Sequence, residues 1–201
     1  KSRFAGAFSL RSRTQSDTGG DPALRFGAEM PGVFVTDGVD ASGGEAVVPG
    51  VVSTSASRTN LILANPTKQG VTAKVTVRSA DGQTTGTVDG VYVPPFSRQQ
   101  LDGVATAAGF PSLPLGSLSV AATAGGGRVV PIASVIDNDS NSFSHLKGRR
   151  VGSGAFRALI VPGVVRVTGA NDTRYRTALR IANGPATPAQ QQLVYGYVAM
   201  D

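Results

Sequence analysis

Hydrophobic and polar residues alternate one by one along much of this chain. The clearest case is Val71–Ser79, VTAKVTVRS, in which Val71, Ala73, Val75 and Val77 share one face and polar residues lie between them. A period of two is typical of a β-strand with one buried face. The alternation recurs in short segments separated by turn residues, and it predicts roughly eleven short strands in an all-β fold, an antiparallel β-sandwich.

Turn residues and one helical segment separate the predicted strands. Asp81-Gly82 is typical of a tight turn. The glycines at 125–127 separate the strands predicted at Leu115–Thr123 and Arg128–Ile136, and we expect them to form a hairpin loop in which the apolar residues of the two strands face one another. The only predicted helix is Asp102–Gly109, with Asp102 as its N-cap.

One block of sequence occurs twice. Val47–Thr67 and Ile160–Ala186 both begin with an apolar Pro-Gly segment, pass through polar residues, and reach Arg-Thr, an alternating strand and Ala-Asn. A recurring block indicates a repeated structural unit. We therefore expect one complete β-sandwich unit over residues 47–150, the tail of a unit over 1–46 and the head of a further unit over 151–201.

The two partial units leave three arrangements open. They pair within the chain as a second, smaller sandwich, or they complete units of neighbouring molecules head to tail by strand addition, which gives a filament. Alternatively, they are cuts in a longer array. The opening residue is Lys1, which favours a processed product or an excised fragment.

The net charge is positive and unevenly distributed. There are 19 Lys and Arg against 13 Asp and Glu, and 19 − 13 gives +6. Bases predominate over residues 1–26 and 147–180, and acids predominate between them. Such ends suit a polyanion, but an ordinary surface that faces an acidic neighbour explains them better. The arginines are not interleaved with aromatic residues as in nucleic-acid platforms, so no nucleic-acid partner is expected.

The residues that the chain lacks narrow its chemistry. It has no cysteine, which excludes disulfides, thiolate metal sites and cysteine nucleophiles. No apolar segment reaches the ~18 residues of a membrane-spanning helix, so no transmembrane segment is expected. The single histidine, His145, lies in a predicted polar loop, Asp137–Gly152, and the chain has no Gly-x-Ser-x-Gly elbow. A solvated loop histidine explains His145 better than catalysis, and we expect no enzyme.

One segment matches part of a calcium-binding pattern. Asp137, Asp139 and Asn141 have the i, i+2, i+4 spacing of a calcium loop. However, Ser142 stands where that loop needs glycine, and Gly148 stands where it needs glutamate. A polar hairpin loop explains the segment better. Calcium is the one cofactor candidate, and no other cofactor is expected.

Three segments resemble a repeat module of large secreted and cell-surface bacterial proteins. They are PGVV…GANDTRYRTALRIANGPA, NLILANPT…VTAKVTVRSADG and VYVPPFSRQQLDGVA. The resemblance lies in the order Pro-Gly-Val, Arg-Thr-x-Leu, Asn-Pro, two strands, a Pro-rich turn and a short helix. The chain departs from it at Asn183-Gly184-Pro185, where Asn-Pro is interrupted. The resemblance implies an immunoglobulin-like sandwich and an extracellular or cell-surface location.

Together these observations favour a non-enzymatic structural protein that acts by self-association, in a filament or array, or by adhesion. A binding module for an acidic glycan or another polyanion is the alternative, and a viral or phage structural protein is compatible with the same fold. The residues expected at the assembly edges are apolar or basic and lie on the partial units. They are Phe8, Leu10, Arg11, Arg13, Val161, Val164, Arg174, Arg176 and Arg180.

Overall fold

The strands pair in antiparallel ladders, and the all-β prediction is confirmed. The computed structural model describes residues 11–15, 27–33, 35–151, 166–168 and 174–176. The strands are β1 (Arg11–Gln15), β2 (Gly27–Pro31), β3 (Val39–Asp40), β4 (Ala46–Ser53), β5 (Ser57–Asn65), β6 (Val71–Ser79), β7 (Thr85–Val93), β8 (Ser97–Leu101), β9 (Leu113–Gly125), β10 (Arg128–Asp137), β11 (Phe143–Lys147), β12 (Arg149–Arg150), β13 (Arg166–Thr168) and β14 (Arg174–Arg176). The helices are the 3-10 turn η2 (Val35–Asp37) and α1 (Val104–Ala107). Within these ranges no helix is long and apolar enough to cross a bilayer.

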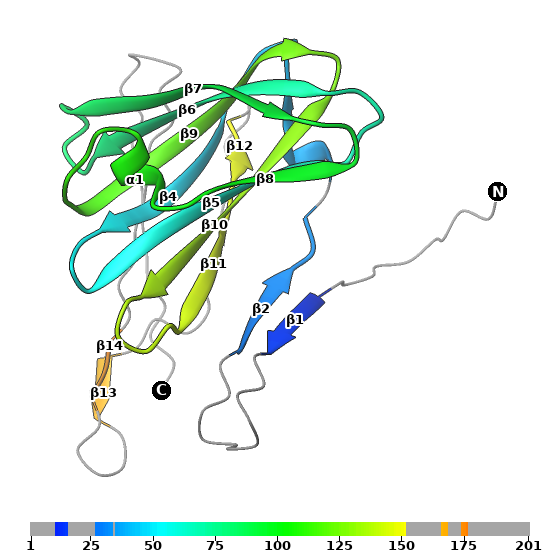
Figure 1. The fold of residues 1–201 in the computed structure, drawn as a ribbon. Coiled ribbons are helices and arrows are strands. Elements are labelled where there is room, and N and C mark those ends of the chain that lie inside the picture. Colours follow the sequence, from blue (N-terminus) through cyan, green and yellow to red (C-terminus); the bar gives the residue numbers. More distant parts are fainter. Residues whose placement is uncertain (1–10, 16–26, 34, 152–165, 169–173, 177–201) are drawn as a thin grey trace.

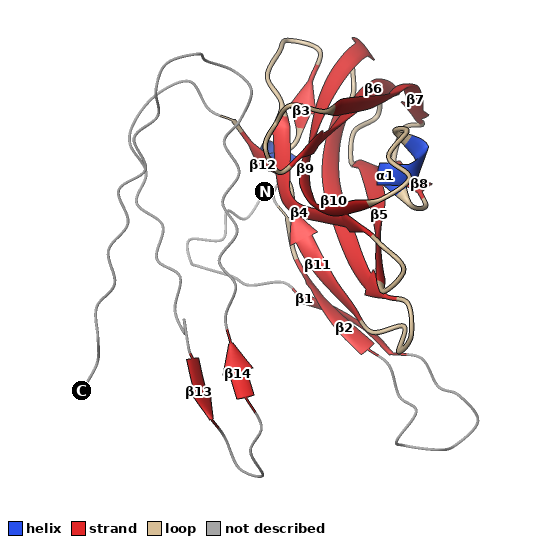
Figure 2. Ribbon diagram, turned by 90° about the vertical axis from the view of Figure 1, so that its left-hand side faces the viewer, coloured by secondary structure: helices blue, strands red, loops and turns tan. Residues whose placement is uncertain are grey.

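The main sheet divides into two sets of strands. Its order is β11-β10-β5-β4-β9-β6-β7, with β3 on β10, β8 on β5 and β12 on β4 (Figure 1). The ladder between β4 and β5 consists of a single pair, Ser53 and Arg58. One set therefore contains β3, β5, β8, β10 and β11, and the other contains β4, β6, β7, β9 and β12. The two sets are visible in Figure 2, where α1 lies beside β8.

Both sets contribute to one hydrophobic core. Every second residue of β5 and β6 is buried, as the alternation predicted, and the fully buried leucines Leu61, Leu63 and Leu118 come from β5 and β9. The core cluster is aliphatic apart from Phe110. The chain has no tryptophan. Each buried Val or Leu contributes about 1.5–3 kcal/mol, so many such residues together stabilise the core.

The repeated block forms β4 and β5 in its first copy. The register of β4 against β9 shifts between Pro49 and Val51, and Gly50 has a φ of 83°, so this strand is bulged beside Pro49, which has no N–H to donate to a ladder. Thr59 of the Arg-Thr pair is fully buried. Its Oγ1 accepts a hydrogen bond from Val52 N and donates one to Val52 O, both at 2.9 Å. The Pro-Gly-Val-Val and Arg-Thr motifs are therefore tied together across the turn.

The glycines at 125–127 do not form the expected hairpin. Strand β9 pairs with β4 and β6, whereas β10 pairs with β3, β5 and β11, so the chain crosses from one set to the other at this point. The crossing requires a close approach, because a Cβ on Gly127 would lie 2.2 Å from the carbonyl oxygen of Gln69. Gly127 N donates to Gly70 O at 3.1 Å. The glycines thus allow two backbone segments to pass each other.

Two further predictions need correction. The helix α1 is a single turn whose N-cap is Gly103, with a φ of 55°, and not Asp102. The carboxylate of Asp102 instead accepts from Gln100 Nε2 at 2.7 Å. The segment Asp137–Gly152 is not one polar loop, because it contains β11, paired with β10, and β12, paired with β4.

Residues that precede position 47 belong to the same core. Val39 and Ala46, which the sequence analysis assigns to the N-terminal partial unit, are fully buried in the core cluster. Val39 pairs with Val129 of β10, and Ala46 pairs with Val120 of β9. The part of the chain that carries β3 and the start of β4 therefore packs with the central unit.

Candidate functional site

The expected edge residues that the structure describes lie on two short ladders. Arg11 and Arg13 belong to β1, which pairs with β2. Arg174 and Arg176 belong to β14, which pairs with β13. These ladders are separate two-stranded sheets, so the described arginines do not share one edge. The other expected edge residues lie outside the described residues; they are Phe8, Leu10, Val161, Val164 and Arg180.

The calcium candidate forms the turn between β10 and β11. Asp137 Oδ1 accepts from Asp139 N at 3.1 Å, from Ser140 N at 2.8 Å and from Ser140 Oγ at 2.8 Å. These bonds, those of Ser140 first, hold the pKa of Asp137 below its usual value. Asn141 has a φ of 55°, and its N–H donates to Asp137 O at 2.9 Å. Hydrogen bonds within the turn thus account for Asp137, and the described ranges contain no cluster of three metal-ligating His, Asp or Glu side chains.

His145 lies on a strand and not in a solvated loop. It stands opposite Ser134 in the ladder between β10 and β11, with His145 Nδ1 2.9 Å from Ser134 Oγ. The ring of Phe143 meets it edge-on at 5.2 Å. Burial lowers the pKa of His145, which favours the neutral imidazole. Within the described ranges no carboxylate hydrogen-bonds to either residue of the pair, so the arrangement is that of a packed cross-strand pair.

The turns of the main sheet gather at two opposite ends. Asn65 pairs with Ser97, and Val71 pairs with both Val93 and Gly125, so the turns 66–70, 94–96 and 126–127 lie at one end. Basic residues at or beside these turns are Lys68, Arg98 and Arg128. We call this end the basic end. Arg128 is ion-paired with Asp40, whereas Lys68 and Arg98 are exposed.

The opposite end carries the other charge. Ser53 pairs with Leu113, Ser79 with Gly116, and Asp137 with Ser57, so the turns 54–56, 80–84, 102–112 and 138–142 lie together there. These turns contain no Lys or Arg. Their acidic residues, together with the last residue of β10, are Asp81, Asp102, Asp137 and Asp139. Arg58, near the start of β5, is the base beside these turns, and its guanidinium donates to Asn138 Oδ1. We call this end the acidic end.

One buried side chain holds the basic end together. Asn65 is 2% exposed, and its Nδ2 donates to Gln69 O at 2.7 Å, to Val93 O at 3.2 Å and to Pro94 O at 3.1 Å. Its Oδ1 accepts from Thr67 N at 3.0 Å and from Thr67 Oγ1 at 2.6 Å. The Asn of the repeated Ala-Asn motif therefore fixes two turns at once.

Two exposed aromatic residues lie at the basic end. Phe96, between β7 and β8, is 74% exposed and has a φ of 48°, which is uncommon for a bulky residue. Its N–H donates to Thr67 O at 3.0 Å. Tyr92 is 57% exposed, and its hydroxyl lies over Gly70, where a Cβ would approach it to 2.4 Å. The sequence analysis did not single out either residue, because Phe96 stands in a short polar segment where nothing indicates its exposure.

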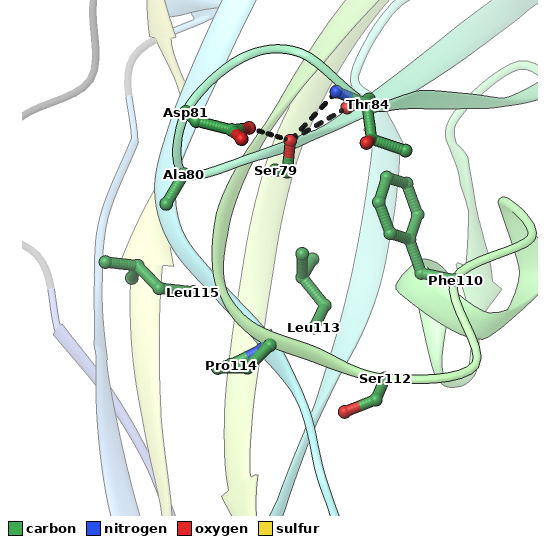
Figure 3. A pocket seen from close by; sticks show the side chains of 9 residues that line it. All are labelled: Ser79, Ala80, Asp81, Thr84, Phe110, Ser112, Leu113, Pro114 and Leu115. Atoms are coloured by element: carbon green, nitrogen blue, oxygen red, sulfur yellow. Dashed lines mark hydrogen bonds between the residues drawn. The ribbon is translucent and has the colours of Figure 1, made fainter.

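An open apolar depression lies at the acidic end. Its volume is about 510 Å³, and its apolar lining includes Phe110, Leu113 and Leu115 (Figure 3). The turn from Ser79 to Thr84 borders it. Ser79 Oγ donates to Asp81 Oδ1 at 2.5 Å, and this bond, with that from Gln83 N at 3.0 Å, keeps the pKa of Asp81 below its usual value. The rim of the depression is therefore anionic at neutral pH.

Comparison with known proteins gives no family for this chain. No family model, no curated protein and no solved structure matches it.

Proposed function

We propose that this protein is a non-enzymatic structural protein that assembles with copies of itself through the two ends of its main sheet, at an extracellular or cell-surface location. The observation that carries the proposal is the opposite charge of these ends. Exposed Lys68 and Arg98 mark one end, and the four carboxylates at the other end outnumber Arg58, which donates to Asn138 there. Complementary charges steer association and fix its orientation.

The edge strand β7 supports association through the ends over association through the edges. Between Ala73 and Val75 of β6 the register shifts, so that Asp89 and Gly90 of β7 both lie opposite Lys74. Lys74 Nζ lies 3.3 Å from Asp89 Oδ1. A bulge and charged side chains are the features with which proteins block strand addition at an exposed edge.

Sedimentation velocity of the full chain at low and high salt tests this proposal. We expect concentration-dependent association at about 20 mM salt that weakens at about 500 mM salt, because exposed charges are screened over a few ångströms at high ionic strength. The double substitution Lys68→Glu with Arg98→Glu should abolish the salt-sensitive part of this association. A sample that stays monomeric at every concentration and salt contradicts self-assembly.

Arg149→Glu together with Arg150→Glu is the matched control. The change of net charge equals that of the test variant, but both residues are exposed on β12, which pairs with β4 and lies outside the turns of the basic end. Association that depends on the charge of the basic end should survive in this control. Equal loss in both variants would show that only the net charge of the molecule matters.

A second function, binding of an acidic glycan, is favoured by the aromatic residues of the basic end. Tyr92 and Phe96 expose their rings on the part of the surface that carries Lys68 and Arg98. Aromatic faces with nearby cations suit a sulfated or carboxylated sugar. Chromatography on a heparin column tests this second function. Elution of the unmodified chain at low salt, with no change in the Lys68→Glu variant, would count against glycan binding.

A further inference from the structure

We infer that Phe96 of one molecule inserts into the apolar depression of the next, so that copies of this chain join head to tail in an open filament. The inference rests on the proposed self-assembly and names its central contact. It follows from the position, exposure and backbone of Phe96, and from the position and lining of the depression.

Phe96 is held in place for an outward contact. Its side chain is 74% exposed, although a phenyl ring is among the groups that gain most from burial. Its left-handed backbone, at a φ of 48°, costs about 1 kcal/mol or more in a residue with a Cβ. Asn65 fixes the turn from both sides through Pro94 O and Thr67 N, so the exposed ring is presented by an ordered turn. Strained residues on well-fixed turns are often functional.

The apolar depression suits an aromatic ring. Leu115 is 38% exposed at its edge, and Phe110 and Leu113 form part of its lining at 7% and 3% exposure. Aromatic anchors that fill apolar pockets near the centre of an interface contribute most of the binding energy in protein complexes. The rim of the depression carries the Asp81 carboxylate, whereas exposed Lys68 and Arg98 lie at the end that carries Phe96, so the charges beside the ring and beside the depression are opposite.

The positions of the two features determine the kind of assembly. Phe96 follows Val93, which pairs with Val71 at one end of β6, whereas the depression includes Ser79 at the other end of β6. A contact between different surfaces at opposite ends of a molecule is heterologous, so it repeats without closing unless the rotation between copies happens to close a ring. A two-fold dimer would instead need both contacts to form reciprocally between the same two molecules, laid antiparallel side by side along their length.

Two variants of the full chain, mixed together, test the head-to-tail contact. Phe96→Ala removes the ring, and Leu115→Gln makes the depression polar at similar volume. Each variant alone should associate about 30-fold more weakly than the unmodified chain, as expected for loss of an interface anchor. Mixed in equal amounts, they should form one-to-one dimers and nothing larger, because one intact ring and one intact depression remain.

Val35→Ala is the matched control, because Val35 is also an exposed apolar residue, at 49% exposure, in η2. It should assemble like the unmodified chain. Thermal unfolding followed by circular dichroism identifies any variant that fails to fold, and the Phe96 variant, whose ring is exposed, should fold normally. Salt-sensitive assembly that is unchanged by Phe96→Ala overturns this contact but leaves the proposed function standing. An unmodified chain that never assembles overturns both.

The absence of cysteine allows a second readout on the same molecule. A variant with both Ser97→Cys and Ala80→Cys places one thiol beside Phe96 and one beside the depression. Under oxidation it should give a ladder of covalent oligomers, whereas each single variant should give at most dimers. Absence of the ladder while non-covalent assembly persists contradicts the head-to-tail arrangement.

Discussion

The two ends of the main sheet are fixed by side chains of different chemistry. At the basic end the buried amide of Asn65 both donates and accepts, and it carries no charge at any pH. At the acidic end the exposed carboxylate of Asp137 only accepts, from Asp139 and Ser140. A buried amide is costly to remove because its partners lose their hydrogen bonds in a dry place, whereas water replaces the partners of an exposed carboxylate. The hydrogen bonds of Asn65 therefore hold at every pH, whereas those that Asp137 accepts weaken when its carboxylate is protonated.

The largest effect should come from Asn65→Ala. The change leaves the buried carbonyl of Val93 and the partly buried carbonyl of Pro94 without their amide donor, so the free energy of unfolding should fall by about 3 kcal/mol. Urea unfolding measures it. Asn60→Ala is the control on the same strand, since Asn60 accepts one bond, from Gly103 N at 2.9 Å, and should cost about 1 kcal/mol. Equal losses in the two variants would remove the special role of Asn65.

A smaller loss should follow Asp40→Asn, which breaks the ion pair with Arg128 beside the basic end. The pair is about three-quarters buried, with 25% and 23% of the side chains exposed, and its removal should cost about 1 kcal/mol. The hydrogen bond from Ser42, then those involving Arg128, hold the pKa of Asp40 below its usual value. The contribution is therefore complete above about pH 4 and is lost as the pH falls through the lowered pKa. The difference in unfolding free energy between the two chains should shrink in acid.

Phe96→Asn should have a small effect of opposite sign. Asparagine adopts the left-handed region more readily than phenylalanine, and the exposed ring makes little packing contact, so stability should rise by about 0.5 kcal/mol. Thermal unfolding measures the gain. Self-association should weaken in the same variant. A loss of stability would mean that the ring packs on its own molecule.

The smallest effect should be local and confined to the acidic end. Protonation or Asp137→Asn weakens the acceptor for Ser140, and the folded pKa of Asp137 is lowered, so the turn should loosen only as the pH falls below about 4. Amide-exchange protection of Ser140, referenced to Thr67 at the basic end, measures the difference. Parallel loss of protection at both amides would show that the two ends do not respond separately to pH.

The strands were predictable from the sequence because alternation reports which side chains are buried. The predicted Val71–Ser79 coincides with β6, and the predicted Arg128–Ile136 lies within β10. Alternation does not report which strand is the partner. The glycines at 125–127 are equally compatible with a hairpin and with a crossing, and only their contact with Gln69 and Gly70 decides between them.

The candidate site was less predictable for a related reason. The opposite charges of the two ends arise when turns distant in sequence meet, so neither Lys68 nor Asp81 signals its role alone. Strand β11 is short, and its residues Ser144, His145 and Lys147 are typical of a loop, which concealed the pairing of His145 with Ser134. The exposure of Phe96 depends on the turn fixed by Asn65, which is a tertiary contact.

The crossing at residues 125–127 has a consequence for how this protein is made. Strand β4 pairs with β9 and β5 pairs with β10, so the two ladders are complete only when synthesis has passed residues 125 and 137, respectively. Pairings this distant in sequence close slowly, and the unpaired strands stay open to other chains in the meantime. In a nascent chain that has reached the end of β7, Leu61 and Leu63 are exposed, because β9 and β10 have not yet been made. The chain is therefore most open to such contacts until β10, which follows the crossing, has been made.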